Sequence, residues 1–171
     1  MTAFLLSVHV LAAIVAIGPV SVAASMFPPA ARRALAAPDD SRAVGTVRLL
    51  LRICRVYAVV GVVVPVFGLA TAKNMGVLGD TWLIVSMALT ALAALLLVAF
   101  VLPRQTAIAE SLEQRSTEDG GGGPGDVAVA AAPAVTREAT VRLAMLTGVF
   151  NLLWAVVTVL MIVRPGSTTG V

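Results

Sequence analysis

Residues 81–103, TWLIVSMALTALAALLLVAFVLP, form a run of 23 residues without one charged side chain. A helix needs about 20 apolar residues to cross the roughly 30 Å hydrocarbon core of a bilayer. Three further uncharged runs cover residues 3–26, 56–72 and 143–163. The second of these is short, but arginine side chains at its end can extend to the headgroups. The sequence therefore predicts an all-α, integral membrane four-helix bundle.

The overall composition also indicates a chain that lies in lipid. Of its 171 residues, 59% are hydrophobic and 12% are charged, whereas soluble domains average roughly 45–50% and 25%. The mean hydropathy is +0.99. This composition excludes a disordered chain and an ordinary cytosolic enzyme, and the lone cysteine, Cys54, excludes a disulfide scaffold. The length is that of one unit, so we predict a single membrane domain over residues 1–171.

Positive charge is divided unevenly between the connections. Six arginines lie between residues 32 and 55 and four between 104 and 142, while the other two connections carry only Lys73 and Arg164. Because basic residues stay on the cytoplasmic side, we predict that both termini lie outside the inner (plasma) membrane and both arginine-rich connections lie in the cytoplasm. Residues 119–134 include a glycine-rich run and are expected to be a flexible cytoplasmic linker. The basic excess follows membrane sidedness, so no nucleic-acid partner is expected.

The first arginine-rich connection carries two further signals. Pro28 and Pro29 are expected to close the first helix, because proline removes a backbone donor and restricts the residue before it. Arg48, Arg52 and Arg55 follow at spacings of four and three, which puts them on one face of a helix. A stripe of guanidinium groups at a membrane boundary suits anionic lipid headgroups. Simple anchoring and a specific lipid or phosphate site remain open as interpretations of this stripe.

Each predicted span has one face of small or polar residues. Because helices in lipid associate through close packing and interhelical hydrogen bonds, we expect these faces to point into the bundle. They comprise His9, Ala12, Ala13 and Ala16; Gly61, Pro65, Gly68 and Ala72; Ser86, Thr90, Ala93 and Ala94; and Gly148, Asn151, Ala155 and Thr158. We expect Asn151 to bond to another helix or to the carbonyl that Pro65 frees.

The only histidine, His9, is the main functional candidate, because an ionisable residue inside a span is a functional hypothesis by default. Two interpretations stay open: a hydrogen-bonded packing residue, or a proton carrier or ligand. Met87 or Met161 would complete a His–Met pair for haem or copper. Depth along the helices predicts one shared layer containing His9, Pro65, Ser86, Met87 and Thr158. No spacing matches a catalytic triad, so an enzyme is not expected.

Several short motifs resemble a known family. They are LSVHVLAA at 6–13, Gly18-Pro19, Pro65 with Gly68, Trp82-Leu83, Pro103-Arg104, and MIVRP at 161–165. Together they resemble a bacterial family of four-span integral membrane proteins, domain of unknown function 2269. The first-span pattern is also distantly similar to copper-resistance membrane proteins of the CopD type, which have additional histidines or methionines. The first resemblance implies a four-span fold and names no activity, and the second implies copper.

Two functions from different classes follow from these observations. The first is a non-enzymatic packing or interaction module, with the lipid bilayer, a second copy of the chain or a larger membrane complex as its partner. The second is a haem- or copper-binding redox or transport protein that uses His9. The visible spectrum of the purified protein separates them.

Overall fold

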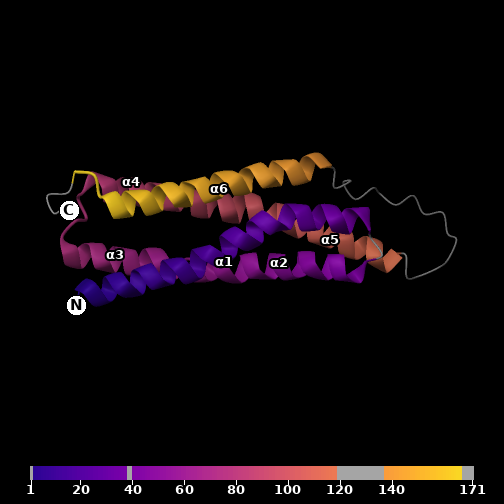
Figure 1. The fold of residues 1–171 in the computed structure, drawn as a ribbon, viewed down its shortest axis with the longest axis horizontal. Helices are drawn as coiled ribbons and strands as arrows, with labels where there is room; N and C mark the ends of the chain where they lie inside the picture. Colours follow the sequence, from indigo (N-terminus) through magenta and orange to yellow (C-terminus); the bar gives the residue numbers. More distant parts are fainter. Residues whose placement is uncertain (1, 38–39, 119–136, 167–171) are drawn as a thin grey trace.

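The computed structural model describes residues 2–37, 40–118 and 137–166, and in this part of the chain it contains helices and no strand. The elements are α1 (Thr2–Ala36), α2 (Ser41–Val60), α3 (Val63–Met75), α4 (Thr81–Leu96), the π-helix η1 (Leu97–Val101), α5 (Leu102–Glu118) and α6 (Arg137–Val163). They form four long rods, because α2 continues into α3 and α4 continues through η1 into α5 (Figure 1). The all-α prediction is confirmed.

All four rods are long and apolar enough to cross a membrane. They run over Ala3–Ala36, Ser41–Met75, Thr81–Arg115 and Glu138–Val163. At 1.5 Å per residue, the 34 or 35 residues of the first three rods reach about 50 Å. The predicted spans are therefore parts of longer helices. The predicted linker, residues 119–134, lies outside the described residues.

The bundle has two distinct ends (Figure 1). At one end lie the N-terminus, the turn between α3 and α4, and the end of α6, and we call it the termini end. At the other end lie the end of α1, the start of α2, the end of α5 and the start of α6, and we call it the arginine end. Most arginines of the chain lie toward the arginine end.

Helix α1 does not stop at its proline pair, so the prediction that Pro28 and Pro29 close the first helix is wrong. The helix continues to Ala36 and changes direction about midway (Figure 1). A proline inside a helix costs about 3 kcal/mol or more, and packing offsets that cost here. Phe27, Ala31 and Ala34 are each 0% exposed and belong to the main core.

The second rod is interrupted at Gly61 and Val62, between α2 and α3. Pro65 has no N–H for the Gly61 carbonyl, and this carbonyl accepts instead from the Val64 N–H at 3.3 Å. Pro65 stands in the first turn of α3, where proline is tolerated. The carbonyl that Pro65 frees is thus satisfied locally, within the same rod.

The third rod contains the five-residue π-helix η1, in which the Leu102 N–H bonds to the Leu97 carbonyl. Its effect is visible in the spacing of one row of buried residues, which runs through Ala93, Leu97, Val101, Gln105, Ile108 and Leu112. In a regular helix, three successive steps of four residues would place the last residue about 120° around the axis from the first, away from the partner helix. The wider turn of η1 absorbs this rotation and keeps one face inward along the whole rod.

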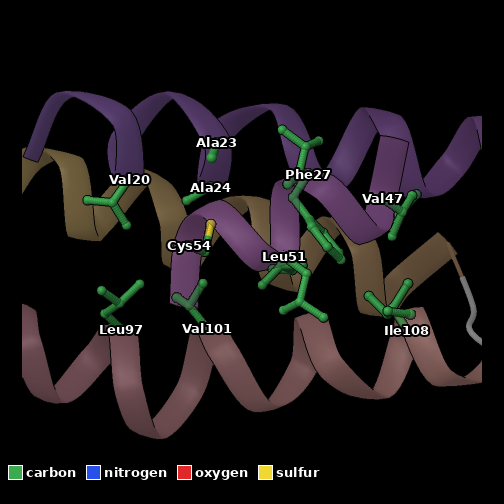
Figure 2. Close-up of a cluster of buried hydrophobic side chains, with 14 of the residues drawn as sticks. Val20, Ala23, Ala24, Phe27, Val47, Leu51, Cys54, Leu97, Val101 and Ile108 are labelled. Carbon is green, nitrogen blue, oxygen red and sulfur yellow. The ribbon is translucent and has the colours of Figure 1, made fainter. Parts of the chain in front are cut away.

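The main core joins the four rods. Helix α1 packs on α2 and α3, α4 packs on α6, and contacts between α1 and α6 and between α2 and α5 connect the two pairs. Figure 2 shows this core, where Phe27, Cys54 and Val101 meet from three different rods. A second, smaller cluster of Ala72, Trp82 and Leu83 lies toward the termini end, with Met161 packed against it. Helices α3 and α4 make no extended contact with each other.

The buried face of α6 differs from the predicted one. The residues inside are Thr140, Leu143, Thr147, Phe150 and Val157, while Gly148, Ala155 and Thr158 are exposed. Leu143, Phe150 and Val157 are the large side chains of this buried face, and Ala155 and Thr158 lie at the exposed surface. Pro65 and Ala94, which were also expected inside, lie at the exposed surface.

Candidate functional site

His9 is packed against α3 rather than against the methionines. Its Nδ1 lies 3.0 Å from the carbonyl oxygen of Val64, and because a carbonyl only accepts, Nδ1 donates this bond. The side chain is buried, at 9% exposure. A β-carbon placed on Gly68 would lie 2.8 Å from His9 Cε1, so the ring occupies the space that the glycine leaves. This geometry matches the packing interpretation of His9.

The proposed methionine partners lie in two different surroundings. Met87 is 46% exposed on α4, a helix that has no extended contact with α1. Met161 packs against the Ala72 cluster, about one turn along α3 from Gly68. The described residues contain no group of three or more His, Cys, Asp or Glu side chains that could hold a metal. Met87 therefore does not fit a His–Met centre with His9.

The predicted polar layer is not assembled. Ser86 is fully buried and its hydroxyl donates to the Trp82 carbonyl of the same helix at 2.8 Å. Thr90 likewise donates to the Ser86 carbonyl. Thr158 is exposed and donates to the carbonyl of Trp154, within α6. With Pro65 and Met87 also exposed, His9 and Ser86 are the buried members of the predicted layer.

Asn151 links α6 to α1. Its Nδ2 donates to the Ser25 hydroxyl at 2.9 Å, and the Ser25 hydroxyl donates in turn to the Ser21 carbonyl at 2.7 Å. The expected bond to another helix is thus present, whereas the suggested bond to the carbonyl freed by Pro65 is not. Asn151 Oδ1 is buried and has no hydrogen-bond partner.

A cavity of about 320 Å³ lies beside this hydrogen bond, between α1 and α6. It is lined by Ser25, Pro28, Pro29 and Arg32 of α1 and by Ala144, Thr147, Gly148 and Asn151 of α6. Pro28 and Pro29 carry no N–H, so the carbonyls of Ala24 and Ser25 lack their usual donors four residues on. The cavity therefore combines a guanidinium group, an amide and small apolar side chains.

The sequence contains the residues of this cavity, but their pattern does not predict it. The proline pair predicts a helix end, and Gly148 predicts a closely packed interior face. A proline pair that remains inside a helix, opposite small residues of a neighbouring helix, leaves unfilled space. Recognising the cavity required knowing that α1 and α6 are neighbours, which the sequence alone does not specify.

The predicted arginine stripe is divided by contacts with α5. Arg48 Nε pairs with Glu113 Oε1 at 2.8 Å, and Arg55 Nη2 donates to the Thr106 hydroxyl at 2.9 Å. Arg52 is exposed. Both groups of the Arg48–Glu113 pair are about half exposed or more, and such pairs contribute about 0–1 kcal/mol. The binding of lipid headgroups by this stripe stays a prediction.

The interior also holds a polar residue that the sequence analysis did not single out. Gln105 is 0% exposed on α5. Neither atom of its amide has a partner with hydrogen-bond geometry, although the Cys54 thiol lies beside it. A buried amide without partners costs stability. Gln105 lies in the core beside the free cysteine Cys54, so its position does not indicate a ligand-binding role.

No family model matches the chain, and no curated protein or solved structure matches it either. The resemblance to the four-span family therefore stays a prediction.

Proposed function

We propose that this chain is a multi-pass protein of a bacterial inner membrane that serves as a non-enzymatic packing module, either with copies of itself or within a larger membrane complex. Both termini lie outside and the arginine end lies in the cytoplasm. The resemblance to the four-span integral membrane family supports this placement. So does the charge distribution, with ten basic residues in the two long connections and two elsewhere.

The low burial of the apolar helices carries the membrane part of the proposal. In the most apolar 18-residue stretch of each rod, only 11% to 22% of the residues are buried inside the chain. Lipid tails cover apolar side chains as well as protein does, so burial alone does not drive association. Helices in lipid associate through close packing and polar contacts instead. Much of the surface of this bundle is exposed and available for such contacts with another helix.

Two structural features favour a protein partner beyond lipid. Helices α3 and α4 are neighbours in the chain yet approach each other little along their backbones and meet mainly in the small Ala72 cluster. The outward face of α6 also carries Ala155 and Thr158, two small residues at which another backbone can approach closely. A module that completes its packing with other helices accounts for both features.

The proposal is tested by measuring the mass of the native assembly. A membrane-solubilising polymer extracts the protein together with its surrounding lipid. We expect native mass spectrometry to show assemblies heavier than the 17.5 kDa chain. Ala155→Leu should shift assemblies toward the single chain if the α6 face takes part, whereas the matched change Ile162→Leu, at a residue 75% exposed, should not. A single chain with lipid alone, at every concentration and without co-purifying proteins, would contradict the proposal.

Cysteine labelling tests the orientation separately. Cys54 is the only cysteine and is buried, so Cys54→Ser provides a background without thiols. In it, Gly79→Cys in the turn between α3 and α4 should react with a membrane-impermeant maleimide added to intact cells. Arg42→Cys should react only after the cells are opened. The reverse pattern would show that the bundle is inserted the other way.

A further inference from the structure

We propose that the cavity between α1 and α6 binds the phosphate group of a phospholipid, with Arg32 as its cation. The inference rests on the membrane placement proposed above and adds a ligand that a packing module does not require. Its starting point is the cavity described above, which places a guanidinium group, the Asn151 amide and small apolar residues side by side.

The shape of the cavity follows from three backbone features. The proline pair breaks the regular hydrogen bonding of α1, and opposite it α6 presents Ala144 and Gly148. A β-carbon on Gly148 would meet nothing within 4 Å, so the space beside it is open. The volume of about 320 Å³ falls at the lower end of the roughly 300–1,000 Å³ found for small-molecule sites. It holds a headgroup and the start of an acyl chain rather than a whole lipid.

The charge of the cavity selects an anion. Guanidinium groups bind phosphate through two parallel hydrogen bonds, and Arg32 is the charged residue of the lining. The ion pairs in the described part of the chain join Arg48 to Glu113 and Arg142 to Glu138, and neither uses Arg32. Basic pockets between membrane helices on the cytoplasmic side are a known way to bind anionic headgroups.

The depth of the polar groups indicates an amphiphile rather than a free ion. Arg32 follows Ser25 by seven residues of α1, which places it about 10 Å closer to the arginine end. A phospholipid at this site would hold its phosphate at Arg32 and its glycerol region deeper, near the Asn151 amide. Beyond its bond to Ser25, the Nδ2 group of that amide retains one N–H, which can donate to a hydroxyl or ester oxygen. Gly148 and Ala144 precede Asn151 in α6 and so lie between it and the arginine end, where they leave room for the headgroup and the glycerol region.

Lipid retention by the intact chain tests the proposal. The protein is placed in nanodiscs of phosphatidylcholine containing a minor share of phosphatidylglycerol. Native mass spectrometry then removes the bulk bilayer and counts the lipid molecules of each type that stay bound to the protein. Arg32→Gln should lower retention of phosphatidylglycerol about tenfold or more. Arg33→Gln removes the same charge from the neighbouring exposed residue and should leave retention unchanged. Gly148→Leu should abolish retention by filling the cavity while leaving Arg32 in place.

Inorganic phosphate serves as the second arm, measured by calorimetry on the detergent-solubilised protein. We expect no saturable binding at millimolar phosphate. Saturable phosphate binding that Arg32→Gln removes, without preferential retention of phosphatidylglycerol, would overturn the lipid assignment and identify a free phosphate as the ligand. Two results would overturn the site itself. One is an equal loss of phosphatidylglycerol retention in Arg32→Gln and Arg33→Gln. The other is retention that neither Arg32→Gln nor Gly148→Leu changes. A protein chain that cross-links to Gly148→Cys in place of lipid would also overturn it.

Two controls keep these outcomes interpretable. The helix content of each variant, measured by circular dichroism, shows that the bundle is intact. Flotation of wild-type protein with vesicles shows membrane insertion, and failure there contradicts the proposed function rather than the cavity. A wild-type chain that inserts as a monomer and retains phosphatidylglycerol would contradict the packing module while supporting the lipid site.

Discussion

Replacing Gly68 with alanine is the sharpest test of the contact between α1 and α3. The new methyl carbon would lie 2.8 Å from Cε1 and 3.2 Å from Nδ1 of His9, well inside the 3.5–4.0 Å at which carbon atoms attract. The ring has little freedom to withdraw, because Nδ1 is bonded to the Val64 carbonyl. We therefore expect the helices to separate slightly or the histidine to leave its position.

The size of the effect follows from two opposing contributions. Overfilling a packed site costs about 1–3 kcal/mol, while alanine is favoured over glycine inside a helix by about 0.5–1 kcal/mol. The net expectation for Gly68→Ala is a loss of about 1–2 kcal/mol in the free energy of unfolding. In a His9→Ala background the obstructing ring is absent, so Gly68→Ala should be stabilising by about 0.5–1 kcal/mol. The coupling between the two positions is then about 1–3 kcal/mol.

Equilibrium unfolding in mixed micelles, with increasing dodecyl sulfate and far-ultraviolet circular dichroism as the signal, measures these differences. Gly45→Ala is the matched control, because this glycine lies inside α2 and its β-carbon would meet nothing within 4 Å. The reasoning is refuted if Gly68→Ala is no less stable than Gly45→Ala, or if Gly68→Ala costs the same with and without the His9 ring.

Three further predictions follow from the core and the candidate site. Phe27→Ala should lower the free energy of unfolding by about 3–5 kcal/mol, since Phe27 is 0% exposed, whereas Phe4→Ala, at a residue 72% exposed, should change it little; similar losses for both would show that Phe27 is not part of a packed core. Gln105→Met should raise the unfolding free energy by about 1–3 kcal/mol, because it removes a buried amide whose atoms lack partners; a loss of stability instead would reveal a polar partner for Gln105. The protein purified in mild detergent should show no Soret band in its visible spectrum, because Met87 is exposed on α4, away from α1, and Met161 is packed against the Ala72 cluster; a band that disappears in His9→Ala would establish the haem hypothesis.

The positions of the four rods were predictable because charge and hydropathy are local properties. Each uncharged run lies within one rod, and the run 143–163 ends where α6 ends. Helix ends depend on tertiary packing as well. The local cost of Pro28 and Pro29 predicts a break, but the buried Phe27 and the contacts of α1 with α2 hold the helix through it.

The inward faces were harder to predict than the spans. Small residues in a membrane helix allow close approach, but they mark an interior face only if a neighbouring backbone is near. On α1 the rule holds at Ala16, which is 1% exposed. On α6 the buried face carries Leu143, Phe150 and Val157, whereas Gly148 borders the cavity beside α1 and Ala155 lies at the exposed surface. The sequence did not specify which helices are neighbours, and so it did not predict the bond from Asn151 to Ser25.

The wide turn of η1 has a consequence for the length of the third rod. With one residue removed from the exposed stretch Val98–Phe100, the inward positions would recur at alternating intervals of four and three, the rhythm of an uninterrupted α-helix. The rod thus contains one residue more than its contacts need, stored as a bulge on the outer surface. A shortening at this place preserves both flanking contact faces, whereas the same shortening within α4 or α5 would rotate one half of the rod away from its partners.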